Sequence, residues 1–330
     1  MSPLTVLESV RDPAGIWNLP AERLAATAAR FPDVRFVRAE GEEHVDVVLR
    51  TADIVLGFCL RARHLPIAAN LRWVHVTAAG VGGVLFPEFI ASPVALTNAR
   101  GLHAISMSEQ AIAMMLMLER RLHRARDAQV AHRWVQAELA DDTPAMGELA
   151  GRTLGLVGFG EVGRAIAQRA RAFEMEVLAV RRHPSHPPEP AHEQWGPDRL
   201  PELLARADWL VLVPPLTADT AGLLDARAFA LLKPGARLLN LGRGGLVDET
   251  AMLRALQSGR LAGAALDVFR DEPLPEGSPL WDHPEVIITP HTAGHGPRYW
   301  ERAMAQFEAN LTRFQAGEPL LNLVDKQAGY

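Results

Sequence analysis

The sequence TLGLVGFGEVG, residues 153–163, is the strongest indication of the fold. Residues 153–157 are mostly apolar and predict a strand, and residues 164–173 predict a helix. Between them stand Gly158, Gly160 and Gly163, in the pattern G-x-G-x-x-G. Glycines at this spacing permit a tight turn, let the backbone approach a pyrophosphate and allow the helix to pack closely on the strand. The alternative is a tight turn that binds no ligand.

A second predicted strand, residues 176–180, completes a βαβ unit. This favours dinucleotide binding at the turn before the helix, which includes Glu161 and Val162, and at the helix N-terminus itself. A site for NAD places Asp or Glu at the end of this strand, about 20 residues on. Here the strand ends in Arg181 and Arg182, whose guanidinium groups suit a 2′-phosphate. We therefore predict NADP(H) in preference to NAD(H). The alternative is that both arginines are only solvated.

The same alternation of short apolar runs and helical stretches continues along the chain, which predicts an α/β fold with parallel sheets. The predicted strands in the first hundred residues are 5–10, 35–37, 54–58, 73–77 and 94–97, and those after residue 150 are 153–157, 176–180, 209–213, 237–241, 264–268 and 286–289.

Three further segments have distinct patterns. Ser106 and Glu109 form an S-x-x-E capping box that predicts a helix to about residue 126. Residues 183–197 are rich in proline and histidine and predict a surface loop. The alternative is a metal site formed by the histidines, which is disfavoured because no carboxylate or Cys is placed to complete it. A final helix is predicted to begin near Pro297 and to end at Gly317.

Composition narrows the class of protein. The 330 residues include 39 acidic and 34 basic side chains, a net charge of −5, which disfavours nucleic acid or a membrane surface as a partner. With 48% hydrophobic residues the chain can form a large core. No apolar run is long enough for a membrane span, and no signal peptide is apparent. Cys59 is the only cysteine, so we expect no internal disulfide and a reducing cytoplasm.

Four chemically capable residues each lie at or after a predicted strand: Arg243, Asp267, Glu272 and His291. In an open α/β sheet the carboxyl ends of the strands face the ligand. Singly, each residue has an ordinary structural explanation. Together with the glycine turn they supply a cationic anchor, an imidazole and a carboxylate to pair with it.

At these residues the chain resembles the D-isomer-specific 2-hydroxyacid dehydrogenases, and within them the NADPH-dependent glyoxylate/hydroxypyruvate reductases. The motifs that carry the resemblance are GFGEVG (158–163), VPPLTADTAGLLD (213–225), LLNLGRGGLVDE (238–249), AALDVFRDEPLP (264–275), ITPHTAG (288–294), TNARGLHAISMSEQAIAMML (97–116) and NLVDKQAGY (322–330).

The resemblance implies a role for each matching residue. Arg243 would bind the substrate carboxylate, His291 would be the acid and base, and Glu272 would stabilise the imidazolium of His291. Asp267 would help position the nicotinamide. The other implied cofactor-binding residues are Pro214, Thr220, Leu241, Gly242 and Gly294. The backbone of Ala79, Gly80 and Val81 would hold the substrate carboxylate, although Gly82 stands where the family often has Asp.

Family structure further implies two Rossmann-like or flavodoxin-like domains. Residues 1–99 and 292–330 would form a substrate-binding domain, and residues 100–291 an inserted dinucleotide-binding domain. The helix beginning near Ser106 would form a homodimer interface. Trp134, after that helix, would pack within the fold or, as the alternative, reach a neighbouring active site.

The resulting expectation is an NADPH-dependent reductase of small 2-oxoacids that yields D-2-hydroxy acids, with no metal. Formate dehydrogenase is disfavoured because its catalytic histidine typically pairs with Gln, whereas this chain has Glu272. Phosphoglycerate dehydrogenases with an added regulatory domain are longer than this sequence. A different class also stays open: a non-catalytic NADP(H)-sensing protein or corepressor on the same fold.

Overall fold

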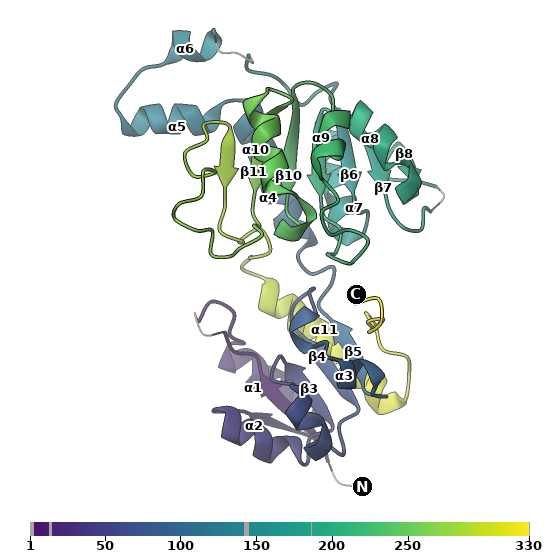
Figure 1. Cartoon of the computed structure of the whole chain (residues 1–330). Helices are drawn as coiled ribbons and strands as arrows, with labels where there is room; N and C mark the ends of the chain where they lie inside the picture. The colour runs from purple at the N-terminus through teal and green to yellow at the C-terminus, as the bar shows by residue number, and fades with distance from the viewer. Residues whose placement is uncertain (1–2, 13–14, 142–144, 186, 330) are drawn as a thin grey trace. The chain divides into compact units, whose positions relative to one another are not determined.

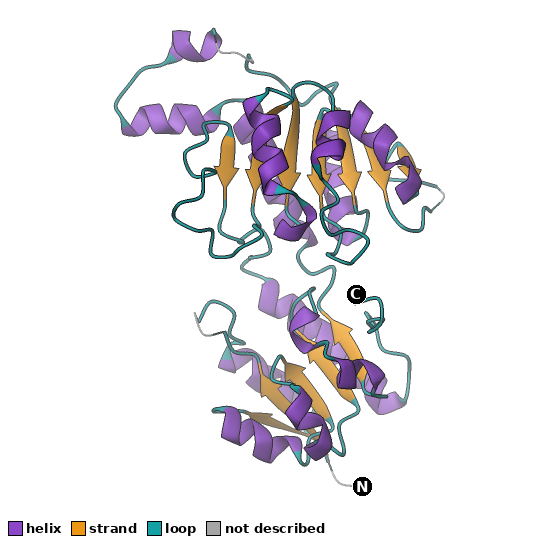
Figure 2. Cartoon of the chain, viewed as in Figure 1, coloured by secondary structure: helices purple, strands orange, loops and turns teal. Residues whose placement is uncertain are grey.

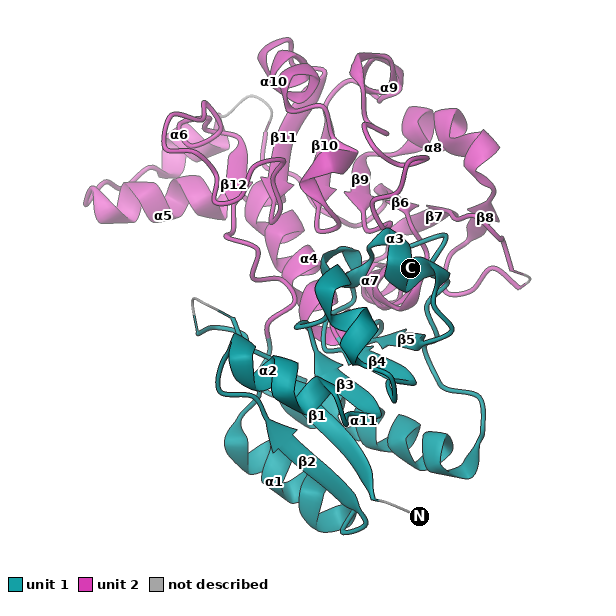
Figure 3. Ribbon diagram, turned by 60° about the horizontal axis from the view of Figure 1, so that its bottom comes forward, with its two compact units in different colours: residues 1–102, 296–330 teal, residues 103–295 magenta. Residues whose placement is uncertain are grey.

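The computed structural model describes residues 3–12, 15–141, 145–185 and 187–329. The chain divides into two compact units, residues 1–102 with 296–330 and residues 103–295, so that the second is inserted into the first (Figure 3). The sequence predicted the changeovers at 99/100 and 291/292, a few residues too early. Residues 291–295 belong with the inserted unit because backbone N–H groups there bond to Asp267.

The inserted unit, unit 2, is built on a seven-stranded parallel sheet in the order β12-β11-β10-β9-β6-β7-β8. Its strands are β6 (Thr153–Val157), β7 (Glu176–Val180), β8 (Glu193–Trp195), β9 (Trp209–Leu212), β10 (Ala236–Asn240), β11 (Leu261–Leu266) and β12 (Val286–Ile288). The order reverses between β6 and β9, and ligands of such sheets bind where the order reverses, outside the strands' carboxyl ends.

Helices cover both faces of this sheet (Figure 2). One face packs on α4 (Ala104–Glu119) and α7 (Glu161–Ala172), the other on α8 (Leu200–Arg206), α9 (Ala226–Leu231) and α10 (Glu249–Gln257). Each face has its own hydrophobic cluster, and the strand residues between them are almost fully buried, as expected for a parallel sheet. The strands are thereby packed on both faces.

Unit 1 contains a five-stranded parallel sheet in the order β2-β1-β3-β4-β5, the flavodoxin-like arrangement. Its elements are β1 (Leu4–Ser9), α1 (Ala21–Arg30), β2 (Val34–Arg38), α2 (Glu42–Leu49), β3 (Ile54–Gly57), β4 (Trp73–Val76), α3 (Pro87–Ala91), β5 (Ala95–Asn98) and α11 (Tyr299–Ala316). Short 3₁₀ helices in the chain span Ala62–Ile67, Gly82–Val84, Pro197–Arg199 and Gly244–Leu246. The predicted fold class, two parallel α/β sheets with one unit inserted into the other, is confirmed.

Several element boundaries differ from the prediction. The helix expected from Ser106 begins at Ala104, and the Ser106 hydroxyl donates to the His103 carbonyl instead of capping. It stops at Glu119 because Arg121 adopts a left-handed φ of 54°, and the separate helix α5 (Leu122–Val130) follows. The expected loop 183–197 contains β8, which pairs with β7. The final helix begins at Tyr299 rather than near Pro297, and Gly317 ends it with a φ of 69°.

No helix of the described residues is long and apolar enough to cross a membrane. After α5 the chain forms α6 (Gln136–Ala140), and both helices extend away from the unit 2 sheet as an arm (Figure 1).

Candidate active site

The glycine turn between β6 and α7 combines two close backbone contacts with one open position. Gly158 has a φ of 92°, and a Cβ there would lie 2.7 Å from the Pro214 nitrogen. A Cβ on Gly163 would lie 2.4 Å from the Gly158 carbonyl oxygen, so the helix packs directly on the turn. By contrast, nothing lies within 4 Å of the position that a Cβ on Gly160 would occupy. The residues therefore fit a group that approaches the backbone at Gly160.

The other predicted cofactor residues of unit 2 surround this turn. Pro214 follows β9 and lies close to both Gly158 and Gly242. A Cβ added to Gly242 would lie 3.2 Å from the Pro214 carbonyl oxygen. The Leu241 N–H bonds the Leu212 carbonyl at 3.1 Å, which continues the β9–β10 ladder. The Thr220 hydroxyl donates to the Pro215 carbonyl at 2.7 Å and so closes the turn after β9. Glu161 and Val162 form the first turn of α7.

Arg181 and Arg182 follow β7 at the same edge of the sheet. The Arg182 guanidinium pairs with Asp219, 3.3 Å away in the turn after β9, and both side chains are exposed. Arg181 makes no side-chain hydrogen bond or ion pair with any residue that the structure describes, and its N–H bonds the Trp195 carbonyl at 3.0 Å. The Arg181 guanidinium is thus available to an anion, whereas the Arg182 guanidinium already has the Asp219 carboxylate beside it.

Arg243 follows β10 and begins the short 3₁₀ helix Gly244–Leu246. Asn240 fixes this turn: its amide donates to the Arg243 carbonyl at 3.0 Å and its side-chain oxygen accepts from the Gly242 N–H at 3.1 Å. The Arg243 guanidinium is exposed and donates to the Gly242 carbonyl at 2.7 Å. A Cβ on Gly244 would overlap the Phe269 carbonyl group, so the turns after β10 and β11 are in direct contact.

His291 and Glu272 form the pair that the sequence predicted. His291 Nδ1 lies 2.7 Å from Glu272 Oε2, and the other carboxylate oxygen accepts from the Phe269 N–H at 2.9 Å. With the Glu272 carboxylate as the acceptor, Nδ1 is the donor, and Nε2 is the ring nitrogen that points away from this contact. The imidazole is half exposed.

Asp267 lies directly after β11, not within it, and is 1% exposed. Its carboxylate accepts hydrogen bonds from Gln110 Nε2, the Thr289 hydroxyl and the N–H groups of Thr292 and Ala293, at 2.5–3.1 Å. These donors hold the buried charge and fix the segment that carries His291. Asp267 was expected to position the nicotinamide. Both of its carboxylate oxygens accept hydrogen bonds from other residues of this chain.

His103, just before α4, lies near both Arg243 and His291. Its Nδ1 donates to the Gly294 carbonyl at 2.9 Å. Burial lowers the pKa of His103, the bond to Gly294 opposes this, and the charges of Arg243, His295 and His291 lower it further. Because these charges act on one imidazole, Arg243 and His291 share one electrostatic environment in unit 2.

Ala79, Gly80 and Val81 lie in unit 1, after β4, whereas the other predicted site residues all lie in unit 2. The Asn98 amide donates to the Ala79 carbonyl at 2.7 Å and fixes this loop. Gly80 is exposed, and Val81 is buried just before the 3₁₀ helix Gly82–Val84.

Three residues that shape the site were not predicted from the sequence: Gln110, Asn240 and Thr289. Gln110 and Thr289 contact Asp267, and Asn240 closes the Arg243 turn. Their positions within the quoted motifs were the only signal, because their roles depend on contacts between distant elements.

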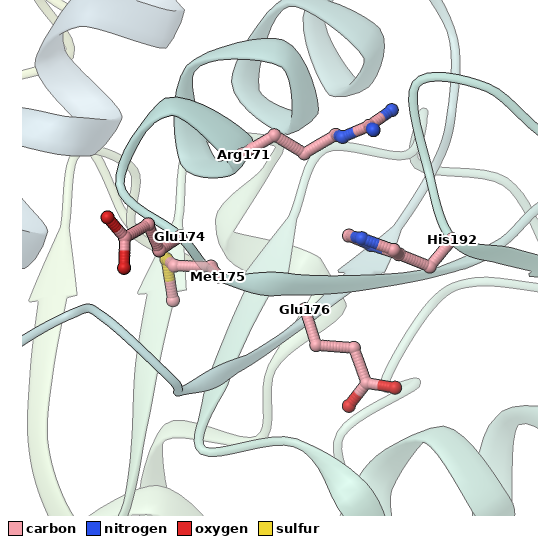
Figure 4. A pocket seen from close by; sticks show the side chains of 5 residues that line it. All are labelled: Arg171, Glu174, Met175, Glu176 and His192. Carbon is pink, nitrogen blue, oxygen red and sulfur yellow. The ribbon is translucent and has the colours of Figure 1, made fainter.

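The hollow shown in Figure 4, of about 330 Å³, lies elsewhere. It is lined by Arg171, Glu174, Met175, Glu176 and His192. Glu176 begins β7, so this hollow is at the amino end of the strand, opposite the carboxyl ends where the candidate residues gather. Within the described ranges no three His, Cys, Asp or Glu side chains are grouped so that they could hold a metal ion.

Comparison with known proteins identifies a family. Residues 112–293 match the family model described as "D-isomer specific 2-hydroxyacid dehydrogenase, NAD binding domain". A D-3-phosphoglycerate dehydrogenase of Bacillus subtilis is 36% identical over 260 residues, which are 78% of this chain. The match covers 48% of that relative, so this chain spans about half its length.

Solved structures match the whole chain. A D-isomer specific 2-hydroxyacid dehydrogenase family protein from Aeromonas salmonicida is 35% identical with a TM-score of 0.82, over 98% of this chain and 100% of that one. An NADPH-dependent glyoxylate/hydroxypyruvate reductase from Sinorhizobium meliloti, in complex with NADP and sulfate, is 30% identical with a TM-score of 0.81, over 99% of this chain and 100% of that one.

Proposed function

Because the chain belongs to the D-isomer specific 2-hydroxyacid dehydrogenase family, a family of NAD(P)-dependent oxidoreductases, we propose that it reduces small 2-oxoacids to D-2-hydroxy acids with NADPH. The substrates we propose are of the glyoxylate, hydroxypyruvate or pyruvate type. The observation that carries this proposal is the His291–Glu272 pair beside the Arg243 turn, on the sheet that also holds the glycine turn.

In the proposed mechanism, the bound nicotinamide cofactor supplies the hydride. His291 donates its Nε2 proton to the ketone oxygen, and Glu272 holds the imidazole through Nδ1 and stabilises its positive charge. Arg243 binds the substrate carboxylate, which a planar guanidinium can grip with two parallel bonds. Within unit 1, the backbone N–H groups of Ala79, Gly80 and Val81 are also proposed to bind a substrate carboxylate.

The cofactor is proposed to lie along the carboxyl ends of the unit 2 strands. Its pyrophosphate would meet the N-terminus of α7 at Gly160, where the space is open. The remaining contacts would come from Gly158, Glu161, Val162, Gly163, Pro214, Thr220, Leu241, Gly242 and Gly294. Asp267 would act on the nicotinamide end through the segment it anchors.

We propose NADPH as the preferred cofactor because two guanidinium groups and no carboxylate end β7. Arg181→Asp should lower the ratio of kcat/KM for NADPH to that for NADH by about tenfold or more, since each charge-assisted contact to a phosphate contributes roughly 1.5–3 kcal/mol. Arg227→Asp, on the exposed face of α9, is the matched control and should leave the ratio unchanged. Equal use of both cofactors by the unaltered protein would refute this preference.

The activity itself is tested by following NADPH absorbance with glyoxylate, hydroxypyruvate, pyruvate, phenylpyruvate and 3-phosphohydroxypyruvate. The last substrate tests a second candidate function, D-3-phosphoglycerate dehydrogenase, which the 36% identity to the Bacillus subtilis enzyme favours. If NADPH binds but no 2-oxoacid turns over, both candidate enzyme functions would be refuted. The protein would then be proposed to be a non-catalytic NADP(H) sensor or corepressor.

Two substitutions test the assigned chemistry. His291→Ala should lower kcat by about 100-fold or more, the typical contribution of a positioned acid, while NADPH binding persists. Arg243→Ala should raise KM and lower kcat together, because it removes binding of the substrate in both the ground and the transition state. A His291→Ala protein with unaltered kcat would remove the mechanism.

We also propose a homodimer formed through α4 and the arm of α5 and α6. The arm exposes large apolar side chains: Leu122, Val130 and Trp134 are 52%, 64% and 89% exposed. Trp134 was expected to pack within the fold, but at 89% exposure it lies open in the single chain. A cytoplasmic location is proposed from the activity and from the free thiol of Cys59, which suits a reducing compartment.

A further inference from the structure

The segment that carries His291 has a backbone conformation that must be held from outside. His291 has a φ of 53°, in the left-handed region that favours glycine. Side chains with a Cβ adopt this conformation only where surrounding contacts impose it. One such contact is the bond from the His291 N–H to the Asp267 carbonyl, at 2.9 Å.

The Asp267 carboxylate provides most of the remaining support. Three of its four donors, Thr289, Thr292 and Ala293, belong to the segment around His291. The fourth, Gln110 on α4, is the only donor to this carboxylate from another part of the described chain. Gln110 is therefore the link between the carboxylate and a helix that packs on the sheet.

Gln110 holds two of these groups at once. Its Nε2 lies 3.1 Å from Asp267 Oδ1 and 3.0 Å from Thr289 Oγ1, and the Thr289 hydroxyl in turn donates to Asp267 Oδ1 at 2.5 Å. The amide can have only this orientation, because the opposite one would place its oxygen against a buried carboxylate. The amide, hydroxyl and carboxylate form a closed triangle.

We infer that Gln110 is a positioning residue for His291, acting through Asp267 and Thr289; this inference rests on the proposed function. The amide keeps the carboxylate in place, and the carboxylate keeps the segment 289–293 in the conformation that directs the imidazole at Glu272. Because Gln110 acts at a distance, it should affect the rate of proton transfer more than the binding of substrate or cofactor.

The kinetic test compares three variants by kcat and KM across pH 5–9. Gln110→Leu should lower kcat by about tenfold, the loss of roughly one hydrogen bond to a charged group, and change both KM values less than twofold. Gln110→Glu should retain activity at low pH, where a neutral carboxyl donates to Asp267, and lose it as pH rises and two carboxylates repel. Ser108→Ala is the matched control, because this buried hydroxyl bonds only carbonyls of its own helix, those of Ala104 and Ile105.

A second measurement does not depend on turnover. Hydrogen exchange of a peptide spanning residues 286–295 should be about tenfold faster in Gln110→Leu than in the unaltered protein or in Ser108→Ala, while peptides from β6 and α7 exchange alike in all three. Unaltered exchange in this peptide, faster exchange throughout unit 2, or an unaltered kcat would overturn the inference. Absence of turnover in the unaltered protein would refute the proposed function, and the exchange data would still decide whether Gln110 holds the segment.

Discussion

Single side chains in this protein take their properties from the atoms that meet them. His291 and His75 show the contrast: the first has a carboxylate at Nδ1, and the second lies in a sealed core. A carboxylate partner favours an imidazolium that can give up a proton, whereas burial favours a neutral ring. The same residue type is therefore chemically useful at one position and structural at the other.

The His291–Glu272 pair predicts a loss of rate when the carboxylate is replaced. Glu272→Gln keeps a side chain that can bond Nδ1 but removes the negative charge beside the ring. The proposed acid loses one hydrogen bond to a charged group, so kcat should fall by about tenfold, while thermal stability stays similar. The measurements are kcat at saturating substrate and thermal unfolding of both proteins; an unaltered kcat would contradict the assigned role of Glu272.

His75 predicts a separate, acid-dependent loss of stability. The ring is fully buried, and burial lowers its pKa to about 3. It bonds Thr97 Oγ1 at 2.8 Å, and the same hydroxyl accepts from Trp73 Nε1. The unfolded chain binds the proton near pH 6.5 and the folded chain does not, so stability falls as pH decreases from about 6.5 to 3, by at most about 5 kcal/mol.

The test is urea unfolding at pH 7.5 and pH 4.5. His75→Gln retains an acceptor for Thr97 and should show a smaller loss of unfolding free energy between the two pH values than the unaltered protein. The exposed His183 provides the control, and His183→Gln should not alter the difference. An equal loss in all three proteins would show that His75 does not contribute.

At the scale of elements, two glycines of the turn differ in the space around them. A Cβ on Gly163 would lie 2.4 Å from the Gly158 carbonyl oxygen, whereas nothing lies within 4 Å of the position of a Cβ on Gly160. Gly163→Ala should lower the melting temperature, whereas Gly160→Ala should leave it almost unchanged and instead weaken NADPH binding by about tenfold or more, because the new methyl occupies the space proposed for phosphate. Thermal unfolding and NADPH titration of both variants separate the two effects, and equal NADPH affinity in Gly160→Ala would argue against phosphate at this turn.

The break between α4 and α5 shows why the helix predicted from Ser106 to about residue 126 is wrong. Glu119 and Arg121 are both fully buried. Glu119 bonds Trp209 Nε1 at 3.1 Å and Arg237 Nη1 at 3.0 Å, and Arg121 pairs with Glu285. The partners of these two buried charges lie on β9, on β10 and in the turn before β12. The turn at Arg121 places both side chains in contact with them.

For the whole molecule, the arm predicts self-association. A mass of two chains is expected by light scattering, and the double substitution Val130→Asp with Trp134→Asp should weaken the dimer by about tenfold or more, because charges replace exposed apolar side chains at the proposed contact. Leu231→Asp on α9, also an exposed apolar position, should leave the mass unchanged. A monomeric unaltered protein would refute the dimer.

The α/β class, the parallel sheets, the glycine turn and the approximate ends of most strands could be predicted from the sequence alone. These follow from local periodicity and from glycine spacing, which neighbouring residues suffice to specify. The sequence also predicted that His291 and Glu272 would pair, through resemblance to a family rather than through spacing.

Three features could be seen only in the folded chain: Asp267 anchors the His291 segment, Gln110 contacts Asp267 from α4, and Arg121 ends a helix. Each depends on a buried charge finding donors or acceptors far away in the sequence, 157 residues in the case of Gln110 and Asp267. A buried charge needs hydrogen-bond partners, and the packing of the fold determines which residues are close enough to supply them. A local sequence pattern does not contain that information.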